Sequence, residues 1–484
     1  MSEYKFLIFW FIALLGCPIG IYLAINYRKF ERFLFFMMIF LTASAFPWFD
    51  INFMSMEWYR GTTRGFEVTV LDLIGIILLG VCLISPRHKK KFTFIPYNFP
   101  FMLALLFLGL CSVLLGSPKI YGFFELHKWI RGAYVYFIIV NYVKDESDFR
   151  VAINALMSIM FYEAFIGLKQ HYLDGMYRIA GTMPHSNTLG SYANMVIAVL
   201  MAIAVDYNEK IKNRYLYYGL ASIAGAICVV LSFSRGAIFT LPVALVLILI
   251  GSFYKRITTR KVTTLMVILF LGLLLSIKAS HGIIDRFINA PESSGESRKE
   301  YKQVAKLMIQ DYPFFGVGLN NFSDSTLTVY GPRTAMYCDN GTPAHNIFYL
   351  TISEGGIFTF ILFIVIWGRF IFLGIRTVLT RKQSLSSSMV LGITCSFITL
   401  GMQNWLEYVY RQTPIYFLFN TFAGLIVVGY SLSTNKTAEP NEQKSLPQKN
   451  RPVRRDYVNA KLSQISSSNY KEQRLTEIVS ELKK

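Results

Sequence analysis

The 484-residue chain has few acidic residues, histidines and cysteines, and it lacks the patterns that mark common cofactor sites. It contains 29 Asp and Glu against 48 Lys and Arg, with six Cys and six His. No cysteine pair has metal-ligand spacing and no disulfide framework is visible; only Cys338 lies in a polar segment. A glycine-rich nucleotide loop is also missing, which disfavours a cytoplasmic nucleotide-sugar enzyme. The sequence therefore predicts neither a cofactor nor a metal site.

The composition instead indicates an integral membrane protein. Hydrophobic residues make up 54% of the chain and aromatic residues 16%, and apolar blocks of roughly 17–25 residues, the length that crosses a bilayer as a helix, recur along it. The net charge of +19 does not indicate a nucleic-acid partner, because membrane proteins collect Lys and Arg in cytoplasmic loops. The first block, 5–25, has no cleavage site behind it and is followed by basic residues, so we expect a retained span and not a signal peptide.

The apolar blocks predict an all-α fold: a polytopic transmembrane bundle of about 12–14 spans over residues 1–432. Basic clusters fall in alternate loops, which places those loops in the cytoplasm and puts the loops between them, with a short N-terminus, on the outer side. The expected spans are 5–25, 33–49, 68–85, 99–116, 126–142, 151–169, 188–205, 215–233, 237–253, 263–278, 346–373, 388–403 and 413–432. The expected outward loops are 50–67, 117–125, 170–187, 234–236, 279–345 and 404–412.

The longest outward loop, 279–345, is predicted to fold as a helical cap. It opens with turn and cap formers at 291–295, and its apolar residues then follow helical spacing over 298–310. Pro313 is expected to end this helix, and the glycines of 316–318 to form a turn.

The tail, 433–484, has a different composition from the bundle. It is basic and mostly polar, which predicts a largely disordered cytoplasmic segment. Apolar residues return at helical spacing near 470–484, where we expect a short amphipathic helix on anionic lipid or on a partner protein.

Three outward arginines, Arg178, Arg235 and Arg298, are not explained by topology. Arginine's planar fork matches phosphate oxygens with paired hydrogen bonds. Arg235 is expected in a very short turn, where Gly236 leaves room for a phosphate to approach. The alternative for each arginine is a solvated or headgroup-facing side chain. Asn187, just before the seventh span, is read either as a helix cap or as part of the site.

Several carboxylates lie in or near the expected spans. Glu125 is expected to pair with Lys128 or Arg131 inside the bundle, in a structural role, because charges near a bilayer face usually pair with one another. Glu163 and Glu354 are intramembrane carboxylates, and either could hold an arginine in place.

His345 and Asn346 stand where the cap loop meets the next span. Imidazole is the side chain best suited to take a proton near neutral pH. Together with the outward arginines, His345 suggests a site that holds a diphosphate and activates an attacking hydroxyl. No Asp-rich metal motif lies on the outward side, so cationic side chains would stabilise the leaving diphosphate.

These motifs, taken in order, resemble the O-antigen ligase/polymerase superfamily over roughly residues 60–430. The motifs are the stretch from Arg64 to Asp72, the stretch from Glu125 to Arg131, Ser-Arg-Gly-Ala at 234–237, Pro-Phe-Phe-Gly-Val-Gly-Leu-Asn-Asn-Phe at 313–322, His345-Asn346, and Glu-Gly-Gly at 354–356. The adjacent glycines at 355–356 depart from the family's often separated pair, which leaves ligase against polymerase open.

The resemblance implies a GT-C-like, metal-independent, inverting membrane glycosyltransferase of the bacterial inner membrane, with its active site on the periplasmic face. The donor would be an undecaprenyl-diphosphate-linked glycan, and the acceptor another glycan, lipid A-core or a protein. His345 would activate the acceptor, and Arg235, Arg178 and Arg298 would hold the diphosphate. Asn346, Glu354, Glu125 and Arg131 would support them. The candidate partners are membrane lipids, a flippase and a chain-length regulator.

Two other classes remain open at this point. Intramembrane charges also mark the permeation routes of secondary transporters, although the chain shows no convincing internal repeat. A non-catalytic scaffold of an export complex would tolerate single substitutions of His345 or Arg235.

Overall fold

The computed structural model describes residues 2–43, 51–208, 214–254, 292–334, 341–380 and 384–442, with short pieces between 257 and 277. It separates the chain into two units, Met1–Ser433 and Thr434–Lys484. Most of the predicted tenth span (263–278), Cys338 and the predicted disordered and amphipathic parts of the tail beyond residue 442 lie outside the described residues.

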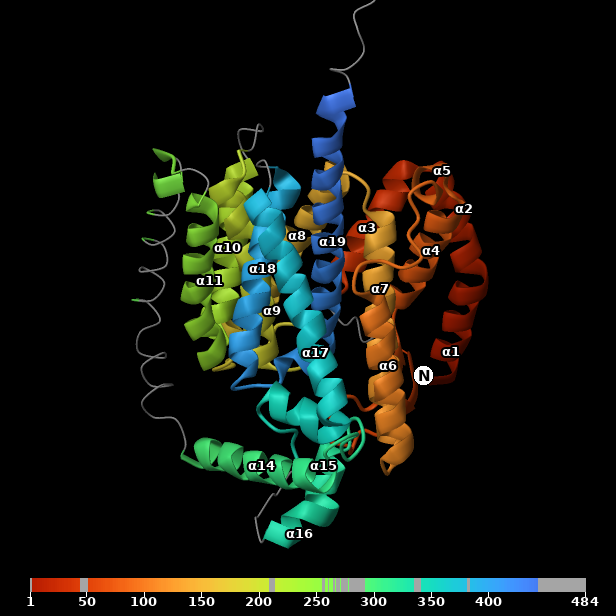
Figure 1. Cartoon of the computed structure of the whole chain (residues 1–484), viewed down its shortest axis with the longest axis vertical. Helices are drawn as coiled ribbons and strands as arrows, with labels where there is room; N and C mark the ends of the chain where they lie inside the picture. Colours follow the sequence, from red (N-terminus) through yellow and green to blue (C-terminus); the bar gives the residue numbers. More distant parts are fainter. Residues whose placement is uncertain are drawn as a thin grey trace, which may run out of the picture. The chain divides into compact units, whose positions relative to one another are not determined.

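Eight helices in the described part are long and apolar enough to cross a membrane, so the protein is a polytopic helical membrane protein (Figure 1). The first is built from α1 (Ser2–Phe11), a π-helical turn and α2 (Cys17–Asn26), at the first predicted span. The others are α8 (Glu146–Tyr172), α9 (Ser186–Asp206), α10 (Arg214–Leu231), α11 (Arg235–Phe253), α17 (Ile347–Thr380), α18 (Leu385–Asn404) and α19 (Thr413–Glu442).

Four more predicted spans also coincide with helices. These are α3 (Arg28–Phe40), which covers the first part of 33–49, α4 (Val70–Ile84), α6 (Phe99–Leu115) and α7 (Lys119–Tyr142). Helices α4 and α6 are apolar but shorter than the eight spans, and α7 carries the charged residues Glu125, Lys128 and Arg131.

Helices α9, α18 and α19 form the centre of the bundle. The apolar stretch of α9 is 94% buried, and those of α18 and α19 are each 83% buried, whereas that of α11 is 28% buried. Close packing of α18 against α9 depends on Gly392, since a Cβ there would lie 2.5 Å from Val199 Cα. Small residues allow helices to approach in this way where the hydrophobic effect cannot drive association.

The predicted cap helix is present. Helix α14 (Glu292–Asp311) lies across one end of the bundle, followed by α15 (Phe322–Ser325), a π-helical turn (Thr326–Tyr330) and α16 (Gly331–Thr334) (Figure 1). It begins six residues before the predicted start, so residues 293–295 are its first turn and not a turn ahead of it. Gly316 and Gly318 have φ of +69° and +107°, as the predicted turn requires.

Within the described residues, the exception to the all-α prediction lies in the segment before α4. Strands β1 (Ile51–Ser55) and β2 (Gly65–Val68) pair antiparallel, with Asn52 opposite Glu67. This hairpin occupies the predicted outward loop 50–67. Its strands are too short to give a clear alternating pattern of apolar and polar residues, so the sequence pattern predicted a loop here.

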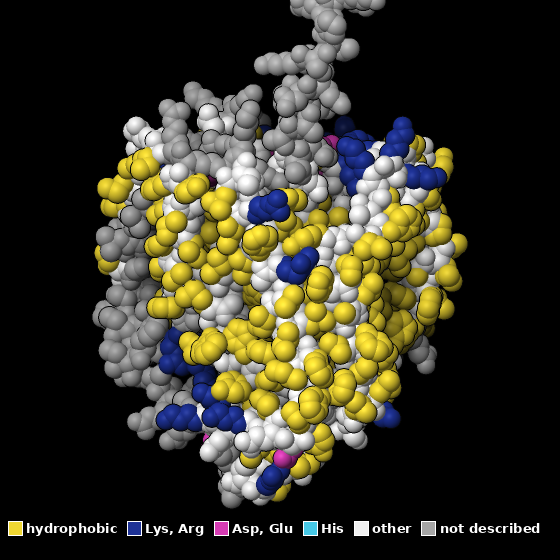
Figure 2. Space-filling view, viewed as in Figure 1, with side chains coloured by type: hydrophobic (Ala, Val, Ile, Leu, Met, Phe, Trp, Pro, Cys, Tyr) yellow, Lys and Arg dark blue, Asp and Glu magenta, His cyan; other side chains and the backbone are white. Residues whose placement is uncertain are grey.

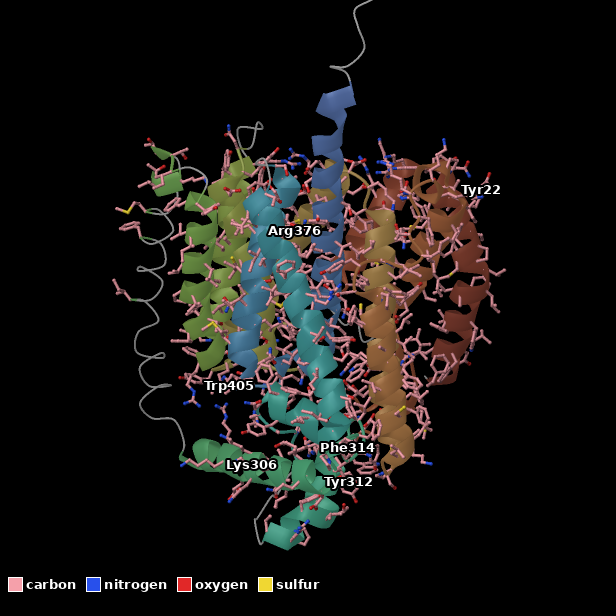
Figure 3. The ribbon with its side chains drawn as sticks, in the orientation of Figure 1. Tyr22, Lys306, Tyr312, Phe314, Arg376 and Trp405 are labelled. Carbon is pink, nitrogen blue, oxygen red and sulfur yellow. The ribbon has the colours of Figure 1, made fainter. Side chains whose placement is uncertain are left out.

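Charge is distributed unevenly along the bundle. The flank seen in Figure 2 is mainly hydrophobic, with Lys and Arg gathered near its upper rim and at its lower left. The basic helix α5 (Pro86–Lys89) lies at the upper end, whereas the cap residues Lys306, Tyr312 and Phe314 lie at the lower end (Figures 1 and 3). The cap and the basic helix α5 thus lie at opposite ends of the bundle, as the alternation of basic and non-basic loops predicts.

Candidate functional site

The centre of the candidate site is a carboxylate that holds two of the predicted residues. Glu407 lies in the loop between α18 and α19 and is 8% exposed. Its Oε1 pairs with an Arg298 guanidinium nitrogen at 2.9 Å, and its Oε2 lies 3.4 Å from His345 Nδ1. Glu407 therefore joins α14 to the start of α17 at the cap end of the bundle.

Electrostatics keep the Glu407 carboxyl ionised. Burial by itself raises its pKa, but the hydrogen bond and charge of His345 and the charge of Arg298 outweigh burial and lower the pKa below its ordinary value. Sequence reasoning did not select Glu407. Its only sequence signal is an acidic residue in a short loop on the side of the predicted arginines.

His345 is positioned by its neighbour. The side-chain oxygen of Asn346 accepts hydrogen bonds from the backbone N–H groups of Phe348 and Tyr349, at 2.9 and 3.0 Å, and so caps α17. Its side-chain nitrogen donates to the Trp405 carbonyl at 2.7 Å. Asn346 thus fixes the helix start next to His345 and links it to the loop that carries Glu407.

The surroundings of His345 favour one proton arrangement. A carboxylate accepts a hydrogen bond, so Glu407 favours the tautomer with the proton on Nδ1 and leaves Nε2 able to accept another. The ring also contacts the Tyr408 ring edge-on, with centroids 5.4 Å apart. The His345 side chain is 30% exposed and lines a cavity of about 670 Å³ that also contains Arg298 and Lys302.

Arg235 and Arg298 line a second cavity, of about 810 Å³, which we call the Arg235 cavity. Arg235 is the first residue of α11 and not part of a turn, because Ser234 caps that helix. A Cβ on Gly236 would lie 3.0 Å from the Gln403 side chain, so Gln403 fills part of the space expected for a phosphate. The cavity is also lined by the polar residues Asn187, Thr240 and Glu407, by Gly401, and by the apolar side chains of Phe233, Phe239, Met402, Trp405 and Leu406.

Arg178 does not line the Arg235 cavity itself but binds Asn187, which does. Its Nε donates to the Ser232 carbonyl at 3.0 Å, and a terminal nitrogen donates to Asn187 Oδ1 at 2.8 Å. Asn187 therefore does not cap α9, whose N-cap is His185. Arg178 positions Asn187, which lines the Arg235 cavity and also hydrogen-bonds Glu407.

The predicted supporting residues Glu125 and Glu354 belong to a separate buried network. Arg411, 1% exposed, donates to Glu125 Oε1 at 2.7 Å and to Glu354 Oε2 at 3.1 Å. Lys128 pairs with Glu125 at 2.7 Å and donates to the Arg411 carbonyl. Glu354 thus holds an arginine and Glu125 pairs with Lys128, as predicted, and both fix the end of the loop that carries Glu407.

The remaining two predicted residues lie elsewhere. Arg131 pairs with Asp72 at 2.6 Å and not with Glu125. Glu163 binds the backbone N–H of Thr182 at 2.9 Å and also its hydroxyl, and the pair ties the 170–187 loop to α8. Neither contacts His345 or the three predicted arginines.

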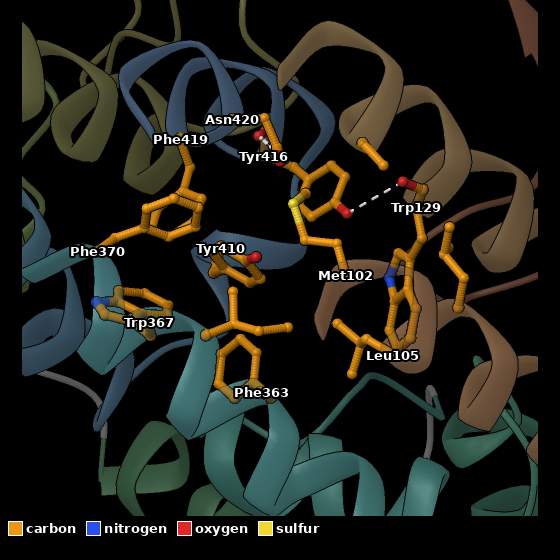
Figure 4. A pocket seen from close by; sticks show the side chains of 13 residues that line it. Met102, Leu105, Trp129, Phe363, Trp367, Phe370, Tyr410, Tyr416, Phe419 and Asn420 are labelled. Carbon is orange, nitrogen blue, oxygen red and sulfur yellow. Dashed lines mark hydrogen bonds between the residues drawn. The ribbon is translucent and has the colours of Figure 1, made fainter. Parts of the chain in front are cut away.

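A further cavity lies inside the bundle and has a different character (Figure 4). It has a volume of about 20 Å³ and is lined by side chains such as Trp129, Phe363, Trp367 and Phe419, with no charged residue among them. A space this small among packed aromatic rings is a packing gap and not a substrate site.

The described residues contain no group of three or more His, Cys, Asp and Glu that could hold a metal ion. What they do contain, at the capped end of a polytopic helical bundle, is a cation-rich site with a histidine and apolar walls. Residues 220–364 match the family model described as O-antigen ligase. This segment, which holds Arg235, Arg298 and His345, is therefore similar to the O-antigen ligase family, and the predicted resemblance is confirmed over it. A search of curated proteins finds no match to the chain.

Proposed function

We propose that the protein is an inner-membrane glycan polymerase or ligase. It transfers a glycan from an undecaprenyl-diphosphate carrier to an acceptor hydroxyl on the periplasmic face. The observation that carries the proposal is the Arg298–Glu407–His345 cluster beside the cavity that contains Arg235. The cluster combines a proton acceptor with phosphate-binding cations in one place.

The donor binds in the Arg235 cavity. Arg235 and Arg298 contact its diphosphate, and Arg178 acts through Asn187. The apolar side chains of Phe239 and Met402 in the same cavity suit the first isoprene units of the carrier. Such a mixed lining matches a ligand that is anionic at one end and hydrocarbon at the other.

The transfer is a single displacement at the anomeric carbon. His345 Nε2 accepts the proton of the acceptor hydroxyl as its oxygen bonds to that carbon, and the bond to the diphosphate oxygen breaks with inversion. Undecaprenyl diphosphate leaves with its negative charge stabilised by the arginines, without a metal ion. Glu407 orients His345 and stabilises the imidazolium that forms.

The acceptor decides between the members of this class. A second lipid-linked glycan makes the protein a polymerase, with a flippase and a chain-length regulator as partners, whereas lipid A-core or a protein makes it a ligase. We favour the polymerase, because nothing in the cap sequence indicates a lipid A-core or protein acceptor.

The test is the His345→Ala variant in cells that lack the wild-type gene, with lipid-linked and transferred glycans analysed. We expect long polymer or transferred glycan to disappear while the protein is produced at its normal level. His171→Ala is the matched control, because His171 bonds the Met176 carbonyl and contacts none of the site residues. Normal glycan in His345→Ala cells would rule out the catalytic role.

A transporter would behave differently in the same system. Reconstituted protein would take up labelled inorganic phosphate, and Arg235→Ala would abolish the uptake. Phosphate uptake that Arg235→Ala abolishes, together with normal glycan in His345→Ala cells, would show that the protein is a transporter and not a glycosyltransferase.

A further inference from the structure

Another cavity borders the loop between α18 and α19, and it differs from the two that contain Arg298. It has a volume of about 820 Å³, and seven threonines line it together with Arg60, Arg64, His185 and Gln412. We call it the threonine cavity. The Arg235 cavity and the cavity of about 670 Å³ that His345 lines, which we call the His345 cavity, share Arg298, Trp405 and Leu406. Both have largely apolar walls. The threonine cavity shares none of their lining residues.

The loop between α18 and α19 separates the threonine cavity from the donor side. Glu407 lines the Arg235 cavity, and the next residue, Tyr408, lines the threonine cavity. His345 contacts both residues, through its Nδ1 and through its ring. On the chain before His345, Thr342 and Pro343 also line the threonine cavity. The proposed base therefore stands at the boundary between this cavity and the donor side.

The lining has the chemistry that carbohydrates need. Hydroxyl, amide and guanidinium groups exchange hydrogen bonds with sugar hydroxyls, and an aromatic ring such as Tyr408 packs against the apolar face of a sugar. Among the described residues, no hydrogen-bond partner is found for the side chains of Thr342, Gln412 and Arg64, so they are available to a ligand.

His185, another residue that lines the threonine cavity, is kept neutral by its surroundings and so can also hydrogen-bond a sugar. Burial, followed by the charge of Arg178, lowers the pKa of His185 below its ordinary value. A neutral imidazole at physiological pH both donates and accepts one hydrogen bond, as a sugar hydroxyl does.

We propose that the threonine cavity binds the sugars of the acceptor glycan next to the one that reacts. This inference rests on the proposed function and adds where the acceptor glycan binds. The donor approaches His345 from the Glu407 side and the acceptor from the Tyr408 side. The hairpin β1–β2 and the Arg64–Glu67 motif, which the donor site leaves unused, then form one wall of the acceptor site.

The test uses the full-length protein in nanodiscs. The probe is the repeat-unit oligosaccharide, released by mild acid from the host's lipid-linked glycan and labelled with a fluorophore at its reducing end. Fluorescence anisotropy gives its Kd, and transfer assays give the KM for the acceptor. The variant combines Thr342→Val, Gln412→Leu and Arg64→Met, which remove hydrogen-bonding groups without filling the cavity.

We expect the Kd of the glycan, or the acceptor KM, to rise at least about tenfold in the triple variant, a change of about 1.4 kcal/mol. The KM for the donor should stay unchanged. Lys306→Met is the control, because Lys306 lies on the exposed side of α14 and lines none of the three cavities. Thermal unfolding of each variant confirms that it folds.

His345→Ala separates the two proposals. It should bind the glycan as the wild type does and fail to transfer it. If the triple variant keeps both the wild-type Kd and the wild-type acceptor KM, the acceptor site is wrong while the proposed function stands. If His345→Ala transfers normally but the triple variant loses glycan binding, the proposed function is wrong and the glycan site stands.

Discussion

At the residue scale, one carboxylate links the two halves of the proposed chemistry. Glu407 holds both Arg298, which we propose binds the diphosphate, and His345, which we propose activates the acceptor. The pKa of its carboxyl is lowered below the ordinary value of a glutamate. The stabilisation from these bonds is therefore fully present above that ordinary value and is lost as the pH falls through the lowered pKa.

Replacing Glu407 by glutamine keeps the shape of the side chain and removes its charge. In Glu407→Gln we expect kcat to fall about 100-fold or more, because His345 loses the carboxylate that orients it and stabilises its charged form. The donor KM should stay level or fall, since Arg298 is released from a competing anion. Steady-state transfer kinetics above pH 6 measure both values.

The control for this change is Glu300→Gln on the same cap helix as Arg298. Glu300 lines none of the three cavities, so its variant should keep wild-type kcat and KM. A Glu407→Gln enzyme with normal kcat would show that His345 works without the carboxylate.

The sequence singled out His345 and Arg298 as candidate site residues but did not indicate their partners. His345 and Arg298 stood out as an imidazole and a cation on the outward side. Their link, Glu407, is 62 residues from His345 and 109 from Arg298. Short loops have no periodicity from which such a pairing could be predicted. The same holds for Arg411, which proved to be the arginine that Glu354 holds.

At the element scale, the loop that carries Glu407 is anchored at its far end by Arg411. The guanidinium is buried between Glu125 and Glu354 and lies over the Trp129 ring, 5.2 Å from the ring centroid. Removing one partner from a buried ionic network leaves charges without compensation, at a cost of about 3–5 kcal/mol.

We therefore expect Arg411→Met to lower both the thermal stability of the purified protein and its transfer activity. Glu125 keeps Lys128 in this variant, whereas Glu354 loses its ion-pair partner. The double variant Arg411→Met/Glu354→Gln removes the charge of Glu354 and should recover part of the stability. Thermal unfolding in detergent compares the two. A single variant as stable as the wild type would contradict the anchoring role.

Helix α17 contains a second local constraint, at Gly356. Its φ of +75° breaks the helix, and a Cβ there would lie 2.0 Å from the Phe314 carbonyl oxygen. The cap therefore docks directly on the helix that begins at Ile347, two residues after His345. The sequence analysis singled out the glycine pair at 355–356 but could not predict the kink. The kink depends on a contact with Phe314, about 40 residues away in the chain.

Gly356→Ala should destabilise the protein by roughly 1–3 kcal/mol or more, from the strained backbone and the clash with the cap. Gly368→Ala is the matched control in the same helix, since no atom lies within 4 Å of a Cβ at that position. It should be neutral or slightly stabilising. Equal melting temperatures for the two variants would mean that the kink is not required.

At the scale of the whole molecule, the fold follows from hydrophobic spans and from the side on which basic residues lie. Every predicted span that falls in the described residues coincides at least in part with a helix, since runs of apolar residues must satisfy their backbone hydrogen bonds internally in lipid. The β-hairpin could not be predicted in this way because its strands are too short to show a clear alternating pattern, and the interhelical ion pairs could not because they join distant segments.

The sidedness of the molecule is the remaining prediction at this scale. The cap end carries the proposed active site, and the opposite end carries the basic helix α5. We expect the cap end to face the periplasm, because Lys and Arg clusters stay on the cytoplasmic side. Single cysteines can report this: Lys306→Cys on α14 and Lys89→Cys on α5, each in a Cys338→Ser background. The other cysteines, Cys17, Cys82, Cys111, Cys228 and Cys395, lie within helices and are buried or partly buried.

A membrane-impermeant maleimide applied to spheroplasts should label Lys306→Cys and leave Lys89→Cys unlabelled until the cells are lysed. The Cys338→Ser parent gives the background signal in both conditions. Labelling of Lys89→Cys alone in intact spheroplasts would put the cap in the cytoplasm. Since His345 lies at the cap end, that result would also exclude transfer on the periplasmic face, because the proposed base and the arginines would then meet only substrates on the cytoplasmic side.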